Sequence, residues 1–398
     1  MVTLLHPFGF PFVPFAIYFH YFFLFLQFCE FHCSILSQTK IFAHASISPV
    51  LAVIKYIRNV CNYLALQNYK PQDIKINFIR KKESRYPMIL QTGMRTDIPA
   101  FYAEWFTNKI KDGYVLVRNP YNPVQVTRYR LDPAVVDLIG FCSKNPTPML
   151  KYMDLLKPFG MYWFVTVTPY GTDIEPRVPD KEKVLDSFSA LSEIVGPDAI
   201  GWRYDPIFLN EKYTVDYHLK KFEHIAARLE GATKTCVISF IDLYQKVWKN
   251  FPEVQRVPKE ERLFLGKEMI RIAGEHGMTI RPCGEGDELS IYGADCSGCM
   301  TKRVYETALG TSLNFPKKQP LRKECTCFLG NDIGAYNTCP HLCRYCYANY
   351  DERTVRENYG KHDPLSPFLI GYLHPEDEIH EAEQKSWVDG QINFFDLL

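Results

Sequence analysis

Three cysteines lie close together near the C-terminus, in the stretch "NTCPHLCRYCYANY" at residues 337–350. Their spacing is Cys339-x3-Cys343-x2-Cys346. Thiolates are soft ligands that favour iron–sulfur clusters, zinc and copper(I). Because a cubane 4Fe–4S cluster normally takes four cysteines, three on one short loop predict a cluster whose fourth iron is open to a small molecule. The alternative is zinc, held by the three thiols together with His341 or another cysteine. Short zinc sites usually pair their ligands as C-x2-C, so the spacing favours the cluster.

The form C-x3-C-x-aromatic-C, with Tyr345 before the last cysteine, resembles the signature of radical SAM enzymes. The resemblance implies a 4Fe–4S cluster whose open iron chelates the amino and carboxylate groups of S-adenosylmethionine. It also implies reductive cleavage of that cofactor to a 5′-deoxyadenosyl radical, which abstracts hydrogen from an unknown substrate. Tyr345 would lie against the adenine. Asn337, at the start of the loop, is the other predicted cofactor contact.

Elements that could position such a loop begin at Met88. From there, apolar strand-like runs alternate with amphipathic helical stretches. "MILQTG" leads into "IPAFYAEWFTNKIKDG", which is expected to end at Gly113, and "MYWFVTVTPYG" leads into "DKEKVLDSFSALSEIVG". The recurrence of this unit predicts an α/β protein with a parallel sheet, and favours a closed or nearly closed (β/α) barrel of the TIM type.

Polar residues collect where the predicted strands end, at the edge on which a barrel builds its active site. We expect substrate or cofactor contacts among Arg95, Asp97, Lys144, Asn145, Arg203 and Asp205. Arg118, Asn119, Tyr170 and Glu175 hold similar positions. Such residues can also cap helices, as Asp97 could do before "IPAF". Arg203 and Asp205 flank a tyrosine in an apolar strand, so we expect both to be ion-paired.

The position of the cysteine loop is unusual, because radical SAM enzymes carry it after their first barrel strand. A closed barrel can be cut between any two βα units without moving its mouth. If "DIGAY" at 332–336 forms the last strand beside an early one, the loop still lies on the catalytic face. We therefore predict a circularly permuted barrel of the radical SAM type.

A closer resemblance is to the bacterial domain-of-unknown-function family eighteen forty-eight. It rests on the stretches "RTDIPAFYAEWF", "VRNPYNP", "FCSKNPTPML", "WRYDPIF" and "DIGAYNTCPHLCRYCYAN". That family is described by a C-terminal cysteine cluster similar to the radical SAM one, so the resemblance implies no established reaction. One departure is visible, since Cys142-Ser143 stand where the family usually has Trp-Thr.

Five more cysteines precede the loop, including a C-x2-C pair and a C-x-C pair that could together hold zinc or a second iron–sulfur cluster. The family resemblance implies that the ligands are Cys283, Cys299, Cys325 and Cys327, with Cys296 an extra. Clustered cysteines in a chain without a recognisable signal peptide favour metal or redox chemistry in the cytoplasm over a disulfide framework.

The composition divides the chain. Residues 1–87 hold nine Lys/Arg, three Asp/Glu and a phenylalanine-rich start, and we expect a non-native or disordered extension with the true start near Met88. A membrane anchor in that stretch is the alternative. We assign 88–282 to the βα units, 283–350 to the cysteine-rich segment and 351–398 to a C-terminal helix and tail. The mildly acidic body, with 37 basic and 42 acidic residues, gives no reason to expect nucleic acid as a partner; no membrane partner is expected either.

Three function classes follow. The first is a radical SAM-like enzyme with an unknown substrate and an electron donor such as flavodoxin or ferredoxin. The second is a non-catalytic iron–sulfur or zinc protein. The third is a barrel hydrolase, which ranks last because the 11 histidines form no H-x-H or H-E-x-x-H motif.

Overall fold

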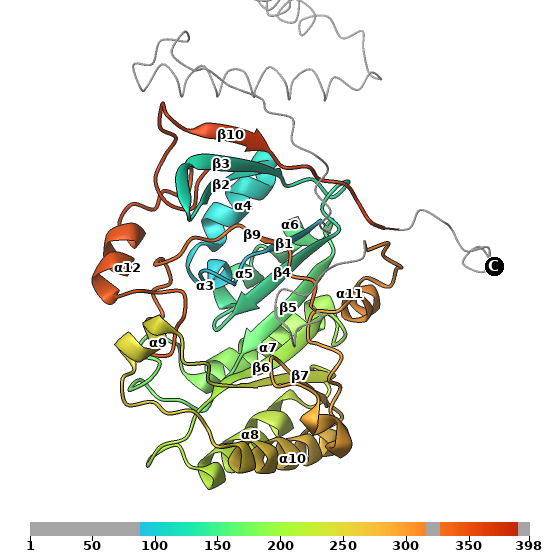
Figure 1. Ribbon diagram of the computed structural model, residues 1–398. Helices are drawn as coiled ribbons and strands as arrows, with labels where there is room; N and C mark the ends of the chain where they lie inside the picture. Colours follow the sequence, from blue (N-terminus) through green and yellow to red (C-terminus); the bar gives the residue numbers. More distant parts are fainter. Residues whose placement is uncertain (1–87, 316–326, 389–398) are drawn as a thin grey trace, which may run out of the picture. The chain divides into compact units, whose positions relative to one another are not determined.

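A seven-stranded parallel sheet carries the candidate site (Figure 1). The computed structural model describes residues 88–315 and 327–388. Every strand pair in this sheet is parallel, and the spatial order is β8-β7-β6-β5-β4-β1-β9. The strands are β1 (Ile89–Gln91), β4 (Leu138–Ser143), β5 (Met161–Thr166), β6 (Ile200–Ile207), β7 (Thr235–Phe240), β8 (Thr279–Pro282) and β9 (Asn331–Asp332). The prediction of an α/β protein with a parallel sheet is confirmed.

Helices connect and cover these strands. They are α3 (Ile98–Phe101), α4 (Ala103–Asp112), α5 (Thr147–Leu150), α6 (Met153–Leu156), α7 (Lys181–Val195), α8 (Val215–Leu229), α9 (Gln245–Asn250), α10 (Lys259–Glu275), the 3-10 helix η2 (Glu288–Tyr292) and α11 (Lys302–Leu309). α8 and α10 lie side by side next to β6 and β7 (Figure 1). Their ends follow local chemistry: Thr214 caps α8 by accepting from Tyr217 N, and α4 ends at Gly113 with φ 76°.

Burial on both faces explains the apolar strand sequences. Tyr162, Trp163, Phe164 and Val165 of β5 are all buried, as expected for a strand of a parallel sheet covered by helices on both sides. Phe141 of β4 stacks on Trp163 with ring centroids 3.9 Å apart. The sheet therefore forms a closely packed support for the polar groups at its carboxyl edge.

The strand that precedes the cysteine loop lies beside the first strand. β9 pairs in parallel with β1, with Leu90 opposite Asn331 and Gln91 opposite Asp332. The expectation that a late strand lies beside an early one is met by β9, but of "DIGAY" only Asp332 belongs to that strand. Within the described residues β8 and β9 are the two edges of the sheet, and no strand pairing joins them into a ring.

A second, separate sheet has three strands, in the order β10-β3-β2. They are β2 (Tyr114–Asn119), β3 (Asn122–Arg130) and β10 (Glu378–Glu381). β2 and β3 form an antiparallel hairpin. The expectation that Arg118 and Asn119 line the mouth is wrong, because Arg118 forms an ion pair with Asp377 beside this second sheet. The C-terminal region also contains the helix α12 (Glu352–Tyr359).

Within the parts of the chain that the structure describes, no helix is long and apolar enough to cross a membrane. The expectations for residues 1–87 lie outside the described residues, as does Cys325.

Candidate functional site

The cysteine loop leaves the carboxyl end of β9, and so lies at the same edge of the sheet as the ends of β4, β5 and β6. Burial raises the pKa of the Cys339, Cys343 and Cys346 thiols. Cys346 also raises the pKa of Cys343, and both raise that of Cys339, as expected for thiols that lie on one short loop. Without a metal these thiols stay protonated at neutral pH, and metal binding must release their protons.

Backbone contacts close the loop on itself. Asn337 adopts a left-handed φ of 58°, its N–H donates to Ala348 O at 3.2 Å, and its side-chain oxygen accepts from Tyr350 N. The predicted cofactor contact Asn337 therefore also ties the two ends of the loop together. Ala348 N donates to Cys346 Sγ at 3.3 Å. Such hydrogen bonds to sulfur are one means by which proteins tune bound clusters.

His341 is held away from a ligand role. Its Nε2 lies 2.9 Å from Asp97 Oδ2, and its Nδ1 lies 3.3 Å from the carbonyl oxygen of Arg177. Both partners are acceptors, so each ring nitrogen faces an oxygen, and a neutral ring donates its single N–H to one of them. The histidine thus anchors the loop to the start of α3, and the zinc set that includes His341 has no support in this geometry.

Asp97 joins three segments. Its Oδ1 accepts from Ala100 N at 3.0 Å, which makes it the N-cap of α3 as predicted. Its Oδ2 accepts from Lys144 N at 2.8 Å and contacts His341. One buried carboxylate therefore fixes α3, the end of β4 and the cysteine loop relative to each other.

Glu175 is the centre of a second buried network. Its carboxylate accepts from Thr168 Oγ1 at 2.7 Å and from Lys144 Nζ at 2.8 Å. Lys181 Nζ and the Tyr345 hydroxyl complete the set. Tyr345, the predicted adenine contact, is therefore held by Glu175, a residue of the connection between β5 and α7.

The charges of this network offset its burial. Burial alone would raise the pKa of Glu175, but Lys144 and then Lys181 outweigh it and hold that pKa well below its usual range. Burial lowers the pKa of Lys144, yet the charge of Glu175, with a smaller contribution from Asp205, raises it overall. The network therefore contains charged groups at neutral pH.

Arg203 and Asp205 pair with each other, as their Nη2 and Oδ2 atoms lie 2.5 Å apart. The expectation that both are ion-paired is confirmed, with a partner on the same strand. Arg203 also acts electrostatically on Cys283 and Cys299, while Asp205 acts on Lys144. This pair therefore lies within electrostatic reach of Cys283 and Cys299 and of Lys144.

Arg95 and Asn145 take more local roles. Arg95 Nε lies 3.9 Å from Asp332 Oδ1. The guanidinium carbon of Arg95 lies 5.4 Å from the centroid of the Tyr336 ring. Asn145 N donates to Ser143 Oγ at 2.9 Å in the turn after β4. Both residues lie beside predicted strand ends, and Arg95 reaches the segment that leads into the cysteine loop.

The second set of cysteines is partly assembled. Cys299 Sγ lies 3.8 Å from Cys283 Sγ and 3.5 Å from Cys327 Sγ, and Met300 N donates to Cys327 Sγ at 3.3 Å. The hydrogen bond from Cys299 lowers the pKa of Cys283 below its ordinary value, and Arg203 adds to this effect. Cys296 has no part in these contacts.

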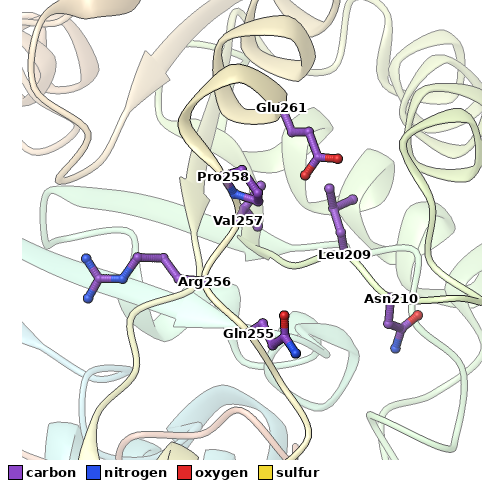
Figure 2. Close-up of a pocket in the computed structure, with 7 residues that line it drawn as sticks. All are labelled: Leu209, Asn210, Gln255, Arg256, Val257, Pro258 and Glu261. Atoms are coloured by element: carbon purple, nitrogen blue, oxygen red, sulfur yellow. The ribbon is translucent and has the colours of Figure 1, made fainter.

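Across residues 88–315 and 327–388, no group of three or more His, Cys, Asp or Glu side chains is placed to hold a metal ion as it stands. A cavity of about 290 Å³ lies beyond the end of β6 (Figure 2). Its lining includes Leu209, Val257 and Glu261, while Arg256 extends away from the other labelled side chains. None of the predicted site residues lines this cavity.

The sequence did not single out Glu175 or Lys181 as site residues. Glu175 was one of several strand-end polar residues, and nothing in its neighbours marked it. Lys181 had a usable signal, because it is the first residue of α7, where a positive charge opposes the helix dipole. An unfavourable charge at a helix start indicates that another contact holds the residue there.

A search among curated proteins gives no match to the chain. A family model described as "Domain of unknown function (DUF1848)" matches residues 89–348, which is well over half of the 398 residues. That match spans the parallel sheet and the cysteine loop. The chain is therefore a member of the DUF1848 family.

Proposed function

We propose that the protein is a radical SAM-like iron–sulfur enzyme, which cleaves S-adenosylmethionine reductively and removes hydrogen from a substrate still to be identified. One observation carries the proposal. Three thiols share a loop at the carboxyl edge of a parallel sheet, with Cys343 buried and Cys339 and Cys346 half-buried, while both ring nitrogens of His341, the imidazole in that loop, face oxygens of Asp97 and Arg177. The loop therefore offers three soft ligands and no fourth.

The residues present fit such a group. Cys339, Cys343 and Cys346 would hold the cluster, and thiolates are its usual ligands. The N–H of Ala348 already points at the Cys346 sulfur. When bound, the cluster would supply an electron and an open iron for the amino and carboxylate groups of the cofactor.

The chain's own residues prepare the surroundings. Glu175 orients Tyr345 through its hydroxyl, so the ring is fixed before a ligand arrives. Tyr170 is buried and its ring centroid lies 5.9 Å from that of Tyr345, which extends an apolar wall beside the loop. Lys144, Arg203 and Asp205 supply charged groups for orienting a ligand. An electron donor such as flavodoxin or ferredoxin would supply the reducing electron.

We also propose that the seven-stranded sheet is the sheet of a circularly permuted barrel of the radical SAM type. Two observations support this. From β1 through β4 to β8 the strands follow one another in chain order, and the last strand, β9, lies on the free side of β1. The loop after β9 then holds the position that a loop after a first strand would hold.

The test uses the full chain, reconstituted with iron and sulfide without oxygen and then reduced. We expect a 4Fe–4S electron paramagnetic resonance signal that changes when S-adenosylmethionine is added. Cys296→Ala is the matched control and should keep this change, whereas Cys343→Ala should lose it. Uptake of zinc alone, or a signal that S-adenosylmethionine leaves unaltered, would contradict the proposal.

A second candidate function is a non-catalytic protein with a structural metal. Its support is the second set of cysteines, whose sulfur separations of 3.5 and 3.8 Å are close to the spacing of about 3.8 Å between thiolates on one tetrahedral zinc with bonds of about 2.3 Å. Zinc bound at Cys283, Cys299 and Cys327, with no iron elsewhere, would favour this candidate. The test compares the zinc content of Cys299→Ala with that of Cys296→Ala, and the first variant alone should lose zinc.

A further inference from the structure

Two lysines from different elements meet one buried carboxylate beside the cysteine loop. Lys144 follows β4 and bonds to Glu175 Oε1, while Lys181 begins α7 and bonds to Glu175 Oε2. Thr168 and Tyr345 also donate to Oε1. Three donors therefore share Oε1 and one bonds to Oε2, and because the Glu175 side chain is fully buried, a ligand from solvent does not reach this carboxylate.

The two ammonium groups, in contrast, have donors to spare. Each carries three N–H bonds, and within the described part of the chain Glu175 is the hydrogen-bond partner of each. Their side chains keep 14% and 25% exposure, whereas that of Glu175 has none. Something that enters the mouth from solvent can therefore reach both lysines but not the carboxylate between them.

The local charge favours an anion. Two lysines and one glutamate leave a net charge of +1, and the N-terminus of α7 adds a partial positive charge at Lys181. Asp205 also acts on Lys144, but it is already paired with Arg203. Since Glu175 holds both ammonium groups in place, little side-chain entropy is lost when an anion binds.

We propose that Lys144 and Lys181 form a binding site for an oxyanion, namely a carboxylate or phosphate group. Lys144 Nζ lies 5.5 Å from the centroid of the Tyr345 ring, so the bound anion belongs to a ligand that occupies the mouth beside the cysteine loop. That this ligand is the substrate, or S-adenosylmethionine through its own carboxylate, rests on the proposed function. The anion site itself does not.

The experiment measures binding of inorganic phosphate to the full-length, metal-free protein by calorimetry at constant ionic strength. Lys181→Met should weaken phosphate binding about tenfold or more, because one charge-assisted hydrogen bond is lost. Lys183→Met is the matched control, since this lysine is exposed on the same helix, and it should bind as the parent does. Lys181→Arg should restore most of the affinity and shows that the site, rather than the fold, responds.

Equal phosphate affinity in Lys181→Met and Lys183→Met, or no binding by the parent, would overturn the anion site. The same variants titrated with S-adenosylmethionine after cluster assembly separate the two sources of the anion. Loss of affinity for phosphate and S-adenosylmethionine together assigns the cofactor carboxylate, and loss for phosphate alone assigns the substrate. Phosphate binding in a protein that assembles no cluster would contradict the proposed function and leave the anion site intact.

Discussion

Glu175 shows how much of the site depends on single buried groups. It lies between β5 and α7, yet it binds the end of β4 through Lys144 and the cysteine loop through Tyr345. Ile174 O also accepts from Arg344 N at 3.0 Å. The segment around Glu175 therefore contacts the loop at two successive residues, and its charge balances two lysines.

Glu175→Gln should lower the free energy of unfolding by about 3 kcal/mol, because it leaves two largely buried ammonium groups without a counter-charge. Urea denaturation measures this. Asp173→Asn is the matched control: its exposed carboxylate pairs with Lys212, so it should cost less than about 1 kcal/mol. Equal losses in the two variants would show that the buried charge is not needed.

His218 gives the fold a pH dependence. Tyr204 OH lies 2.8 Å from its Nδ1, and its Nε2 lies 2.9 Å from Phe208 O, which suits a neutral ring. Burial lowers the pKa of His218 from 6.5 to about 4. Because the folded-state pKa is lowered, this stabilisation is full above pH 6.5 and is lost as the pH falls through about 4.

The size of that loss is about 3 kcal/mol. Unfolding free energies measured between pH 7 and pH 4 should therefore fall more steeply for the parent than for His218→Gln, which cannot take up a proton. Parallel pH profiles for the two proteins would contradict the assignment.

At the residue level, chemistry that depends on spacing could be predicted. The three cysteines and Tyr345 form a local pattern, and Asp97 precedes a helix start, so neighbouring sequence marks them. Glu175 and Lys181 act through partners from other strands. A single sequence holds no information on which distant ammonium group meets which carboxylate. The roles of Glu175 and Lys181 could therefore be recognised only in the structure.

At the scale of elements, α3 links the first strand to the loop. Asp97→Ala should remove the N-cap of α3 and release both Lys144 N and His341. We expect a loss of about 1–2 kcal/mol in stability and faster alkylation of Cys339 and Cys343, followed by mass spectrometry. Thr214→Ala removes the cap of α8 alone and should leave alkylation unchanged. Equal alkylation rates would show that Asp97 does not anchor the loop.

The hairpin of β2 and β3 shows what element patterns could not predict. The sequence of β2 has strand-like residues, and Arg118 and Asn119 at its end were expected among the polar residues at the barrel mouth. Asn119 Oδ1 accepts from Tyr121 N at 2.9 Å in a tight turn, so the two strands pair with each other. Alternation indicates a strand but does not tell which sheet receives it, and Arg118 was misplaced for that reason.

At the scale of the whole molecule, the site depends on β9 reaching β1 across most of the sequence. Gly330 makes this possible, because a Cβ at that position would stand 2.0 Å from Ile89 O. Ile333 N then donates to Gln91 O at 2.9 Å. The cysteine loop is thus attached to the sheet at a point where two backbones nearly touch.

Gly330→Ala should detach β9, lower the unfolding free energy and abolish the hydrogen-exchange protection of Ile333 N. Gly274→Ala is the matched control, and it should change the unfolding free energy in the opposite direction. Gly274 lies in α10 with no atom within 4 Å of an added Cβ, so alanine there should stabilise the protein by about 0.5–1 kcal/mol. Full protection of Ile333 in Gly330→Ala would show that β9 tolerates the extra carbon.

The topology was predictable in outline because the strand–helix repeat implies a parallel sheet, and the late strand had to reach an early one for the loop to lie at the carboxyl edge of that sheet. The second sheet and the β10 strand were not predictable, since β10 pairs with β3 across about 250 residues of sequence. Non-local pairing of short strands depends on tertiary contacts that local patterns do not encode.

The most direct test of the central claim is production of 5′-deoxyadenosine. The full chain would be reconstituted without oxygen, reduced in the presence of S-adenosylmethionine and assayed by chromatography. The parent and Cys296→Ala should both yield 5′-deoxyadenosine, and Cys343→Ala should yield none. A parent protein that takes up zinc and no iron, or product that persists in Cys343→Ala, would contradict the claim.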